Sequence, residues 1–171
     1  RQRQMCIRDR AFTYYDREVL PYKNDDVINA HAMPGAHAAL QAVQDAGLRC
    51  ALFTNPSFPQ GAIECRMGWG DLADAPFELV THMGNTTRCK PDATYYLEQL
   101  QVMGLDPHEV LMVGNDPKRD FPSPACGIQT AYVGQGKPGR ATWHGTMEDF
   151  ARDFNAVVEA FYEHQVADEL S

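Results

Sequence analysis

Two acidic residues, Asp116 and Asp120, lie four positions apart directly after an apolar run from Val110 to Val113. A continuous run of Val, Leu and Met bounded by turn residues is typical of a strand that is covered on both faces. In an open parallel sheet, ligands bind at the carboxyl end of such a strand. Both acids are therefore candidate ligands for Mg²⁺, which keeps most of its waters and takes one or two carboxylates. The alternative is that Asp116 caps the next helix and Asp120 is solvated.

Two other polar segments precede this acidic loop in the sequence. Thr54 and Asn55 follow an apolar run over residues 48–53, and Lys90 stands before a proline and a helical pattern. Each signal is weak alone, because Thr and Asn are common turn formers and an isolated lysine is usually a solvated surface charge. If the apolar runs are parallel strands, however, the three segments lie at the same edge of the sheet.

The elements that would position these residues alternate between strand and helix patterns. Apolar runs predict strands over residues 48–53, 77–81, 110–113 and 129–133. Helical spacing and caps predict helices from Pro34 to Gly47, from Gln60 to Met67, from Pro91 to Gly104, from Pro122 to Gly127 and after Thr146. This order predicts an α/β fold with a doubly wound parallel sheet of about four strands.

Composition limits the kind of protein and its partners. A chain of 171 residues that is 44% hydrophobic can build a globular core. A formal charge of -8 argues against nucleic-acid or anionic-membrane partners, and no apolar run approaches the roughly 18 residues of a membrane span. Five cysteines without a C-x-x-C pair indicate free thiols in a reducing compartment, so we expect a cytoplasmic location. Nothing in the sequence indicates an oligomeric state.

The N-terminal part of the sequence differs from the rest. Residues 1–10 hold four of the fifteen basic residues, and we interpret them as a non-native leader, with a short basic arm as the alternative. Residues 11–30 are rich in aromatic side chains and contain Pro21, which should end or interrupt a short helix. We interpret this segment as the tail of something larger. Residues 31–171 are then the predicted α/β core.

In their order and spacing, the polar motifs resemble a known family. The motifs are Leu52-Phe53-Thr54-Asn55, Cys89-Lys90-Pro91, the Val-Gly-Asn-Asp-x-x-x-Asp stretch from Val113 to Asp120, and the Gly-Ile-Gln-Thr strand that begins at Gly127. They resemble the second, third and fourth motifs of the haloacid dehalogenase (HAD) superfamily, over about Met33 to Val133. This resemblance implies a Rossmann-like HAD core, with residues 11–30 as the remnant of a helical cap.

The resemblance also implies a chemistry, which is phosphomonoester hydrolysis through an aspartyl-phosphate, with Mg²⁺ as cofactor and a small phosphorylated substrate. Thr54 would bind the phosphoryl oxygens with support from Asn55. Lys90 would neutralise charge on the nucleophile and on the transferring group. Asp116 and Asp120 would hold the magnesium ion.

The first motif of the family, Asp-x-Asp-x-Thr after a hydrophobic strand, is absent from the sequence. The most similar stretch, Asp9-Arg-Ala-Phe-Thr13, lacks the second acid and follows no apolar strand. We therefore expect a fragment without its nucleophile, inactive as given, whose full-length parent is an enzyme. Two alternatives stay open. One is a nucleophile-free module that binds phosphate or a nucleotide, and the other is a sheet domain whose acids and lysine are only caps and surface charges.

The strand that would carry this motif has a defined place in the arrangement that the resemblance implies. It lies between the strand over residues 48–53 and the strand over residues 110–113. Without it, we predict either a gap or a forced pairing between these two strands. Unpaired strand edges recruit other chains, so we also predict that the isolated chain aggregates or is loosely folded.

Overall fold

The structure, a computed structural model, describes residues 10–25 and 29–169. Its strands are β1 (Cys50–Leu52), β2 (Phe77–Val80), β3 (Leu111–Gly114), β4 (Gln129–Val133) and β5 (Trp143–Gly145). Its α-helices are α2 (Ala36–Asp45), α3 (Gln60–Trp69), α4 (Ala93–Met103), α5 (Met147–Arg152) and α6 (Phe154–Glu169). Shorter helical turns are η1 (Tyr15–Val19), η2 (Leu20–Tyr22), η4 (Pro107–Glu109) and η5 (Pro124–Cys126). The predicted α/β class is confirmed.

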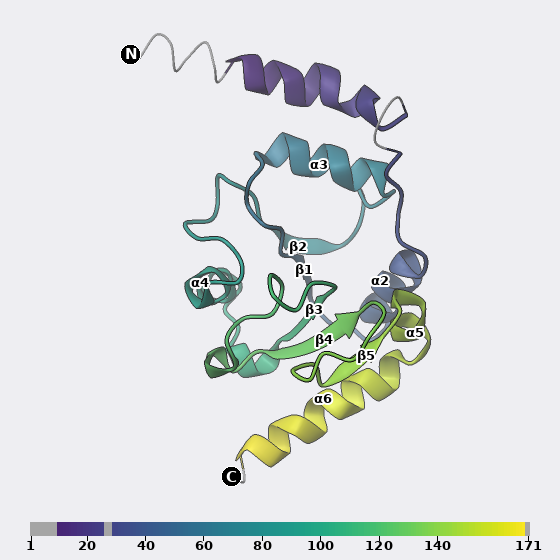
Figure 1. Cartoon of the computed structure of the whole chain (residues 1–171), viewed down its shortest axis with the longest axis vertical. Coiled ribbons are helices and arrows are strands. Elements are labelled where there is room, and N and C mark those ends of the chain that lie inside the picture. Colours follow the sequence, from purple (N-terminus) through teal and green to yellow (C-terminus); the bar gives the residue numbers. More distant parts are fainter. Residues whose placement is uncertain (1–9, 26–28, 170–171) are drawn as a thin grey trace.

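The strands form two separate parallel sheets (Figure 1). One sheet pairs β1 with β2, and its register shifts between Cys50 and Ala51. The other has the order β3-β4-β5, with Leu111 opposite Gln129. In the part of the chain that the structure describes, β1 and β3 do not pair with each other. Of the two predicted outcomes for these strands, the gap is the one observed.

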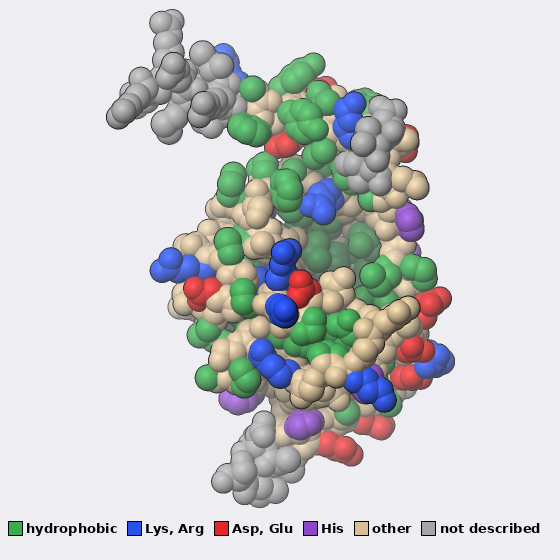
Figure 2. Space-filling view, viewed as in Figure 1, with side chains coloured by type: hydrophobic (Ala, Val, Ile, Leu, Met, Phe, Trp, Pro, Cys, Tyr) green, Lys and Arg blue, Asp and Glu red, His purple; other side chains and the backbone are tan. Residues whose placement is uncertain are grey.

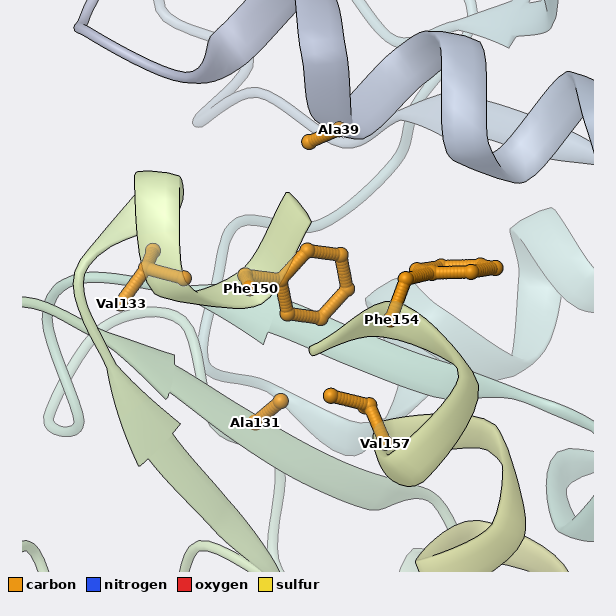
Figure 3. Close-up of a cluster of buried hydrophobic side chains, with 6 residues drawn as sticks. All are labelled: Ala39, Ala131, Val133, Phe150, Phe154 and Val157. Atoms are coloured by element: carbon orange, nitrogen blue, oxygen red, sulfur yellow. The ribbon is translucent and has the colours of Figure 1, made fainter. Parts of the chain in front are cut away.

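The first hydrophobic core lies against one face of the three-stranded sheet. Helices α2, α5 and α6 pack there, and Figure 3 shows Phe150 and Phe154 lying between Ala39 of α2 and Ala131 of β4. Leu111 and Val113 of β3 contact the same cluster. Side chains in a strand alternate between faces, so the residues between these two must point the other way.

The second core lies on that opposite face, where Met112 of β3 packs against α4. Its centre is formed by Tyr95 and Tyr96, both fully buried, with ring centroids 5.0 Å apart. Phe53, directly after β1, packs against the same pair. Two consequences follow. Strand β3 is covered on both faces, as its apolar run predicted, and α4 contacts the ends of both sheets.

The predicted helix boundaries are largely confirmed by their caps. Asp106 and Thr146 each form a capping box, in which the side chain accepts from a backbone N–H and an acid three residues on accepts in return. Gly104 ends α4 with a φ of +66°, a left-handed conformation that glycine adopts without a Cβ clash.

Three expectations about the elements are wrong. The short strand β5 was not predicted, because three residues carry too little periodicity to be recognised. The closing helix after Thr146 is divided into α5 and α6 at Asp153. The helix expected from Pro122 to Gly127 is only the single turn η5, because closely spaced prolines remove N–H donors that a longer helix needs.

The N-terminal segment over residues 10–25 is helical and lies beside α3 (Figure 1). The indole Nε1 of Trp69 in α3 donates to the Pro21 carbonyl over 3.4 Å. The interpretation of residues 11–30 as a cap remnant stays a prediction, and most of the predicted leader lies outside the described residues. Among the helices that the structure describes, none is both long and apolar enough to cross a membrane.

Candidate active site

Lys90 lies where the ends of the two sheets meet. Its side chain is only 9% exposed, and its Nζ donates to the Phe53 carbonyl over 2.9 Å and to Asp120 Oδ1 over 2.6 Å. Phe53 follows β1 and Asp120 belongs to the loop after β3, so one ammonium group contacts both sides of the gap. The description of Lys90 as a solvated surface charge is therefore wrong. An ammonium has three N–H donors, and these two contacts leave a third for a ligand.

Asp120 is bound through both of its carboxylate oxygens. While Oδ1 accepts from Lys90, Oδ2 accepts from the backbone N–H groups of Asn115 at 3.0 Å and Asp116 at 2.9 Å. The buried hydroxyl of Tyr96 donates to the Asp120 carbonyl over 2.6 Å. The alternative of a solvated Asp120 is therefore wrong, since its carboxylate shapes the loop after β3 and orients the lysine.

Gly114, the last residue of β3, allows this close approach of Asp120. A Cβ at position 114 would lie 2.5 Å from the Asp120 Cβ and 2.8 Å from its Oδ2. We expect Gly114→Ala to push Asp120 out of its contacts and to lower the free energy of unfolding by about 1–3 kcal/mol, as overpacking commonly does. Urea unfolding measures this change.

The matched control is Gly68→Ala in α3, where an added Cβ would meet no atom within 4 Å. This exchange should leave stability unchanged or raise it slightly, because alanine favours a helix over glycine. Equal stability of Gly114→Ala and the unchanged protein would show that the Asp120 loop adapts without cost.

Thr54 is held by the residue that follows β2. Its backbone N–H donates to Thr81 Oγ1 over 2.7 Å, and its hydroxyl donates to the Thr81 carbonyl, also over 2.7 Å. The carbonyl of Thr54 accepts from the Tyr95 hydroxyl at 2.7 Å. Burial raises the pKa of Tyr95 to about 12, so the phenol keeps its proton at neutral pH and acts as a donor.

The sequence interpretation did not identify Thr81, Tyr95 or Tyr96 as part of this site. Thr81 and the two tyrosines are fully buried and reach the site from β2 and α4. Burial also raises the pKa of Tyr96, and the nearby Asp120 carboxylate adds to this effect. Apolar spacing along a helix can indicate that a residue such as Tyr96 is buried. It gave no sign that the hydroxyl would reach a loop 24 residues further on.

Asn55 and Asp116 are the more accessible of the predicted site residues. Asn55 is exposed, and its side chain makes no hydrogen bond within the described residues. Asp116 is 43% exposed, with Oδ1 accepting from the Lys118 N–H at 3.0 Å and Oδ2 lying 3.6 Å from Arg119 Nε. Asp116 therefore caps a turn, as the alternative interpretation allowed. Its Oδ2 lies close to the exposed guanidinium of Arg119.

Basic and acidic side chains gather near the centre of the face shown in Figure 2, beside a hollow with hydrophobic walls.

Of the two acids in this loop, one is suited to bind magnesium. Within residues 10–25 and 29–169, no three His, Cys, Asp or Glu side chains are grouped as a metal cluster. Magnesium does not need such a cluster, because one or two carboxylates, waters and substrate oxygens complete its octahedron. The half-exposed carboxylate of Asp116 suits this role, whereas the oxygens of Asp120 already have protein partners.

Three of the five predicted site residues, Lys90, Asp116 and Asp120, thus belong to one hydrogen-bonded network, which Thr54 adjoins. Asp120 contacts Lys90 directly and the Asp116 backbone through Oδ2, and Lys90 contacts the carbonyl of the residue before Thr54. Asn55 is adjacent in sequence, but its side chain makes no hydrogen bond to this network within the described residues. The arrangement offers an ammonium donor, a hydroxyl and a half-exposed carboxylate, which together suit an anionic ligand with a divalent cation.

Comparison with known proteins identifies the family of this site. A family model described as haloacid dehalogenase-like hydrolase matches residues 4–126. The chain therefore belongs to the haloacid dehalogenase-like hydrolase family. A curated relative, phosphoglycolate phosphatase from Rhodospirillum rubrum, is 29% identical over 116 residues, which cover 67% of this chain and 46% of the relative. The chain thus spans about half the length of the curated relative that it matches.

Solved structures share the fold of this chain. β-Phosphoglucomutase from Clostridium difficile matches with a TM-score of 0.64 and 16% identity, over 78% of this chain and 58% of that protein. A HAD family hydrolase from Deinococcus radiodurans R1, solved with bound phosphate and sodium, matches with a TM-score of 0.60 and 20% identity. That match covers 89% of this chain and 75% of the hydrolase.

Proposed function

We propose that this chain is part of a magnesium-dependent phosphatase that hydrolyses small phosphomonoesters. The observation that carries the proposal is the buried ammonium of Lys90, held 2.6 Å from Asp120 between the ends of β1 and β3. A buried cation with a remaining N–H donor is suited to an anion such as a phosphoryl group. Membership of the hydrolase family and the likeness to a phosphate-bound HAD hydrolase support this choice of anion.

Each site residue then has a distinct role. Lys90 donates its third N–H to a phosphoryl oxygen, and Asp120 orients the lysine instead of binding metal directly. The Thr54 hydroxyl can rotate about its Cβ–Oγ1 bond, so its hydrogen can turn from the Thr81 carbonyl to a phosphoryl oxygen. The exposed amide of Asn55 supplies another donor nearby. Asp116 would hold magnesium, which when bound neutralises phosphoryl charge.

The attacking carboxylate belongs, in this proposal, to a strand that is not among the 171 residues. Two observations support this. The sequence contains no Asp-x-Asp-x-Thr, and within residues 10–25 and 29–169 the edges of β1 and β3 away from β2 and β4 are unpaired. A carboxylate at the end of a strand between them would adjoin Lys90. It would attack phosphorus and break the P–O bond to the alcohol, which would leave after taking a proton from the second acid of the Asp-x-Asp-x-Thr motif. Water would then hydrolyse the aspartyl-phosphate and release inorganic phosphate.

The test measures phosphate release from p-nitrophenyl phosphate and a panel of sugar and carboxylate phosphomonoesters by the full-length protein. We expect release that requires magnesium and stops when the metal is chelated. Asp116→Asn should raise the magnesium concentration needed for half-maximal activity at least roughly tenfold, because it removes a charged ligand. Asp120→Asn should change that concentration much less, although it should lower the rate by disturbing Lys90.

The opposite pattern would assign the metal to Asp120. Phosphate binding by the full-length protein without turnover would favour a binding module over an enzyme. Magnesium-dependent turnover by the 171-residue chain alone, lost in Lys90→Ala, would show that the nucleophile is already present.

A further inference from the structure

The backbone of Thr54 is enclosed in a ring of hydrogen bonds that involves two other side chains. The Thr54 N–H donates to Thr81 Oγ1 over 2.7 Å, and the Thr54 carbonyl accepts from the Tyr95 hydroxyl at 2.7 Å. The ring closes through a 2.9 Å contact between Thr81 Oγ1 and the Tyr95 hydroxyl. It therefore starts and ends on the two peptide groups of one residue.

The direction of each hydrogen bond in the ring follows from the number of protons. Tyr95 has one hydroxyl proton, which the Thr54 carbonyl takes. With that proton assigned, we take Thr81 as the donor to the Tyr95 hydroxyl, because this 2.9 Å contact is shorter than those from Thr81 Oγ1 to the Leu52 carbonyl, the Thr54 carbonyl and Thr54 Oγ1, at 3.4, 3.3 and 3.4 Å. Thr81 Oγ1 also accepts from the Thr54 N–H, so each hydroxyl donates once and accepts once. Such a chain is cooperative, because every bond polarises the next.

Burial raises the free energy needed to break this ring of hydrogen bonds. Thr81 and Tyr95 are both fully buried, so water cannot replace a lost partner. The Tyr95 ring is itself fixed by edge contacts with Phe53 at 5.9 Å and Tyr96 at 5.0 Å between centroids. The position of the Thr54 backbone is thus set by α4 and β2, and not by β1 alone.

The ring uses only backbone atoms of Thr54, so its hydroxyl, which donates to the Thr81 carbonyl, can turn toward a ligand without opening the ring. We propose that Thr81 and Tyr95 are positioning residues that hold Thr54 in register for phosphate binding. The proposal rests on the proposed function, because it assigns these residues to the same phosphate site. Neither residue touches the phosphate, so both act through Thr54.

The test compares variants of the full-length protein by their affinity for inorganic phosphate, measured by calorimetry in the presence of magnesium. Tyr95→Phe and Thr81→Val each open the ring while keeping the shape of the side chain. We expect each to weaken phosphate binding about tenfold, the effect of losing one to two kcal/mol of ordering. The double variant should bind no more weakly than either single variant, because a ring is opened only once. Thr81→Ser keeps the hydroxyl and should bind as the unchanged protein does.

A second measurement follows the ring without any ligand. Hydrogen exchange of the Thr54 amide should speed up in Tyr95→Phe and Thr81→Val, because that amide loses its fixed acceptor. Tyr96→Phe is the matched control, since it removes an equally buried hydroxyl that contacts Asp120 instead of the ring. It should leave Thr54 exchange unchanged. Tyr162→Phe, on an exposed part of α6, is the control for phosphate affinity.

The possible failures are distinguishable. Faster Thr54 exchange with unchanged phosphate affinity would make the ring purely structural and leave the phosphatase proposal standing. Additive losses in the double variant would show two independent contacts and no ring. Absence of phosphate binding in the unchanged protein would overturn the proposed function and, with it, the role of the ring. If Tyr95→Phe does not fold, the comparison of Thr81→Val with Thr81→Ser decides in its place.

Discussion

Replacing Asp120 with asparagine is expected to lower the free energy of unfolding by about 3–5 kcal/mol, the range measured when one partner of a buried ion pair is removed. Both oxygens of the carboxylate accept hydrogen bonds, Oδ1 from Lys90 and Oδ2 from two backbone N–H groups. Asparagine has one acceptor and one NH₂ group. In either orientation, the NH₂ group would face a donor and leave Lys90 or the loop without its partner.

Chemical denaturation measures this effect, and a second substitution identifies its cause. The double variant Lys90→Met/Asp120→Asn should be more stable than Asp120→Asn alone, because it no longer buries an unpaired ammonium. Glu78→Gln is the exposed comparison, since its ion pair with Arg49 lies in solvent and should contribute little. If Asp120→Asn lowers the free energy of unfolding by no more than Glu78→Gln does, the buried pair does not stabilise this fold.

The second large effect concerns the gap between the sheets. Strands β1 and β3 each have one paired neighbour, β2 and β4, and each leaves its other edge without a partner in the described structure. Such edges carry rows of N–H and C=O groups that pair readily with other chains. We therefore expect the 171-residue chain alone to associate or to unfold without one cooperative transition.

Light scattering and calorimetry on the 171-residue chain test this expectation, with the full-length protein as the reference. Adding a segment that supplies a strand between β1 and β3 should give a monomer with a single transition. The idea is untenable if the shorter chain is already a soluble monomer with one sharp transition and dispersed amide resonances.

Local sequence signals predicted the elements that depend on local physics. The apolar run before Asp116 predicted a strand covered on both faces, and Leu111 and Met112 indeed face different cores. The cap at Thr146 was also recognised, because it satisfies a helix end within four residues. These features need no knowledge of the rest of the chain.

Contacts between distant residues could not be predicted in the same way. Lys90 bonds to Phe53, 37 residues earlier, and to Asp120, 30 residues later, and no spacing rule connects them. Family resemblance placed Lys90 and Asp120 in one site without indicating that their side chains bind each other. The role of Tyr95 could not be predicted for a related reason. An apolar pattern shows that a ring is buried, but it does not show which atoms the hydroxyl contacts.

The position of Lys90 across the gap affects how its mutants can be interpreted. The lysine acts as a non-covalent cross-link between two sheets that share no backbone pairing in the described residues. Removing it changes the alignment of both sheets together with the charge in the site. A lower rate in Lys90→Ala therefore combines lost chemistry with lost alignment, and kinetics alone cannot divide the two. The chemical contribution of the ammonium is given by the reaction rate of those molecules in which the two sheets remain aligned.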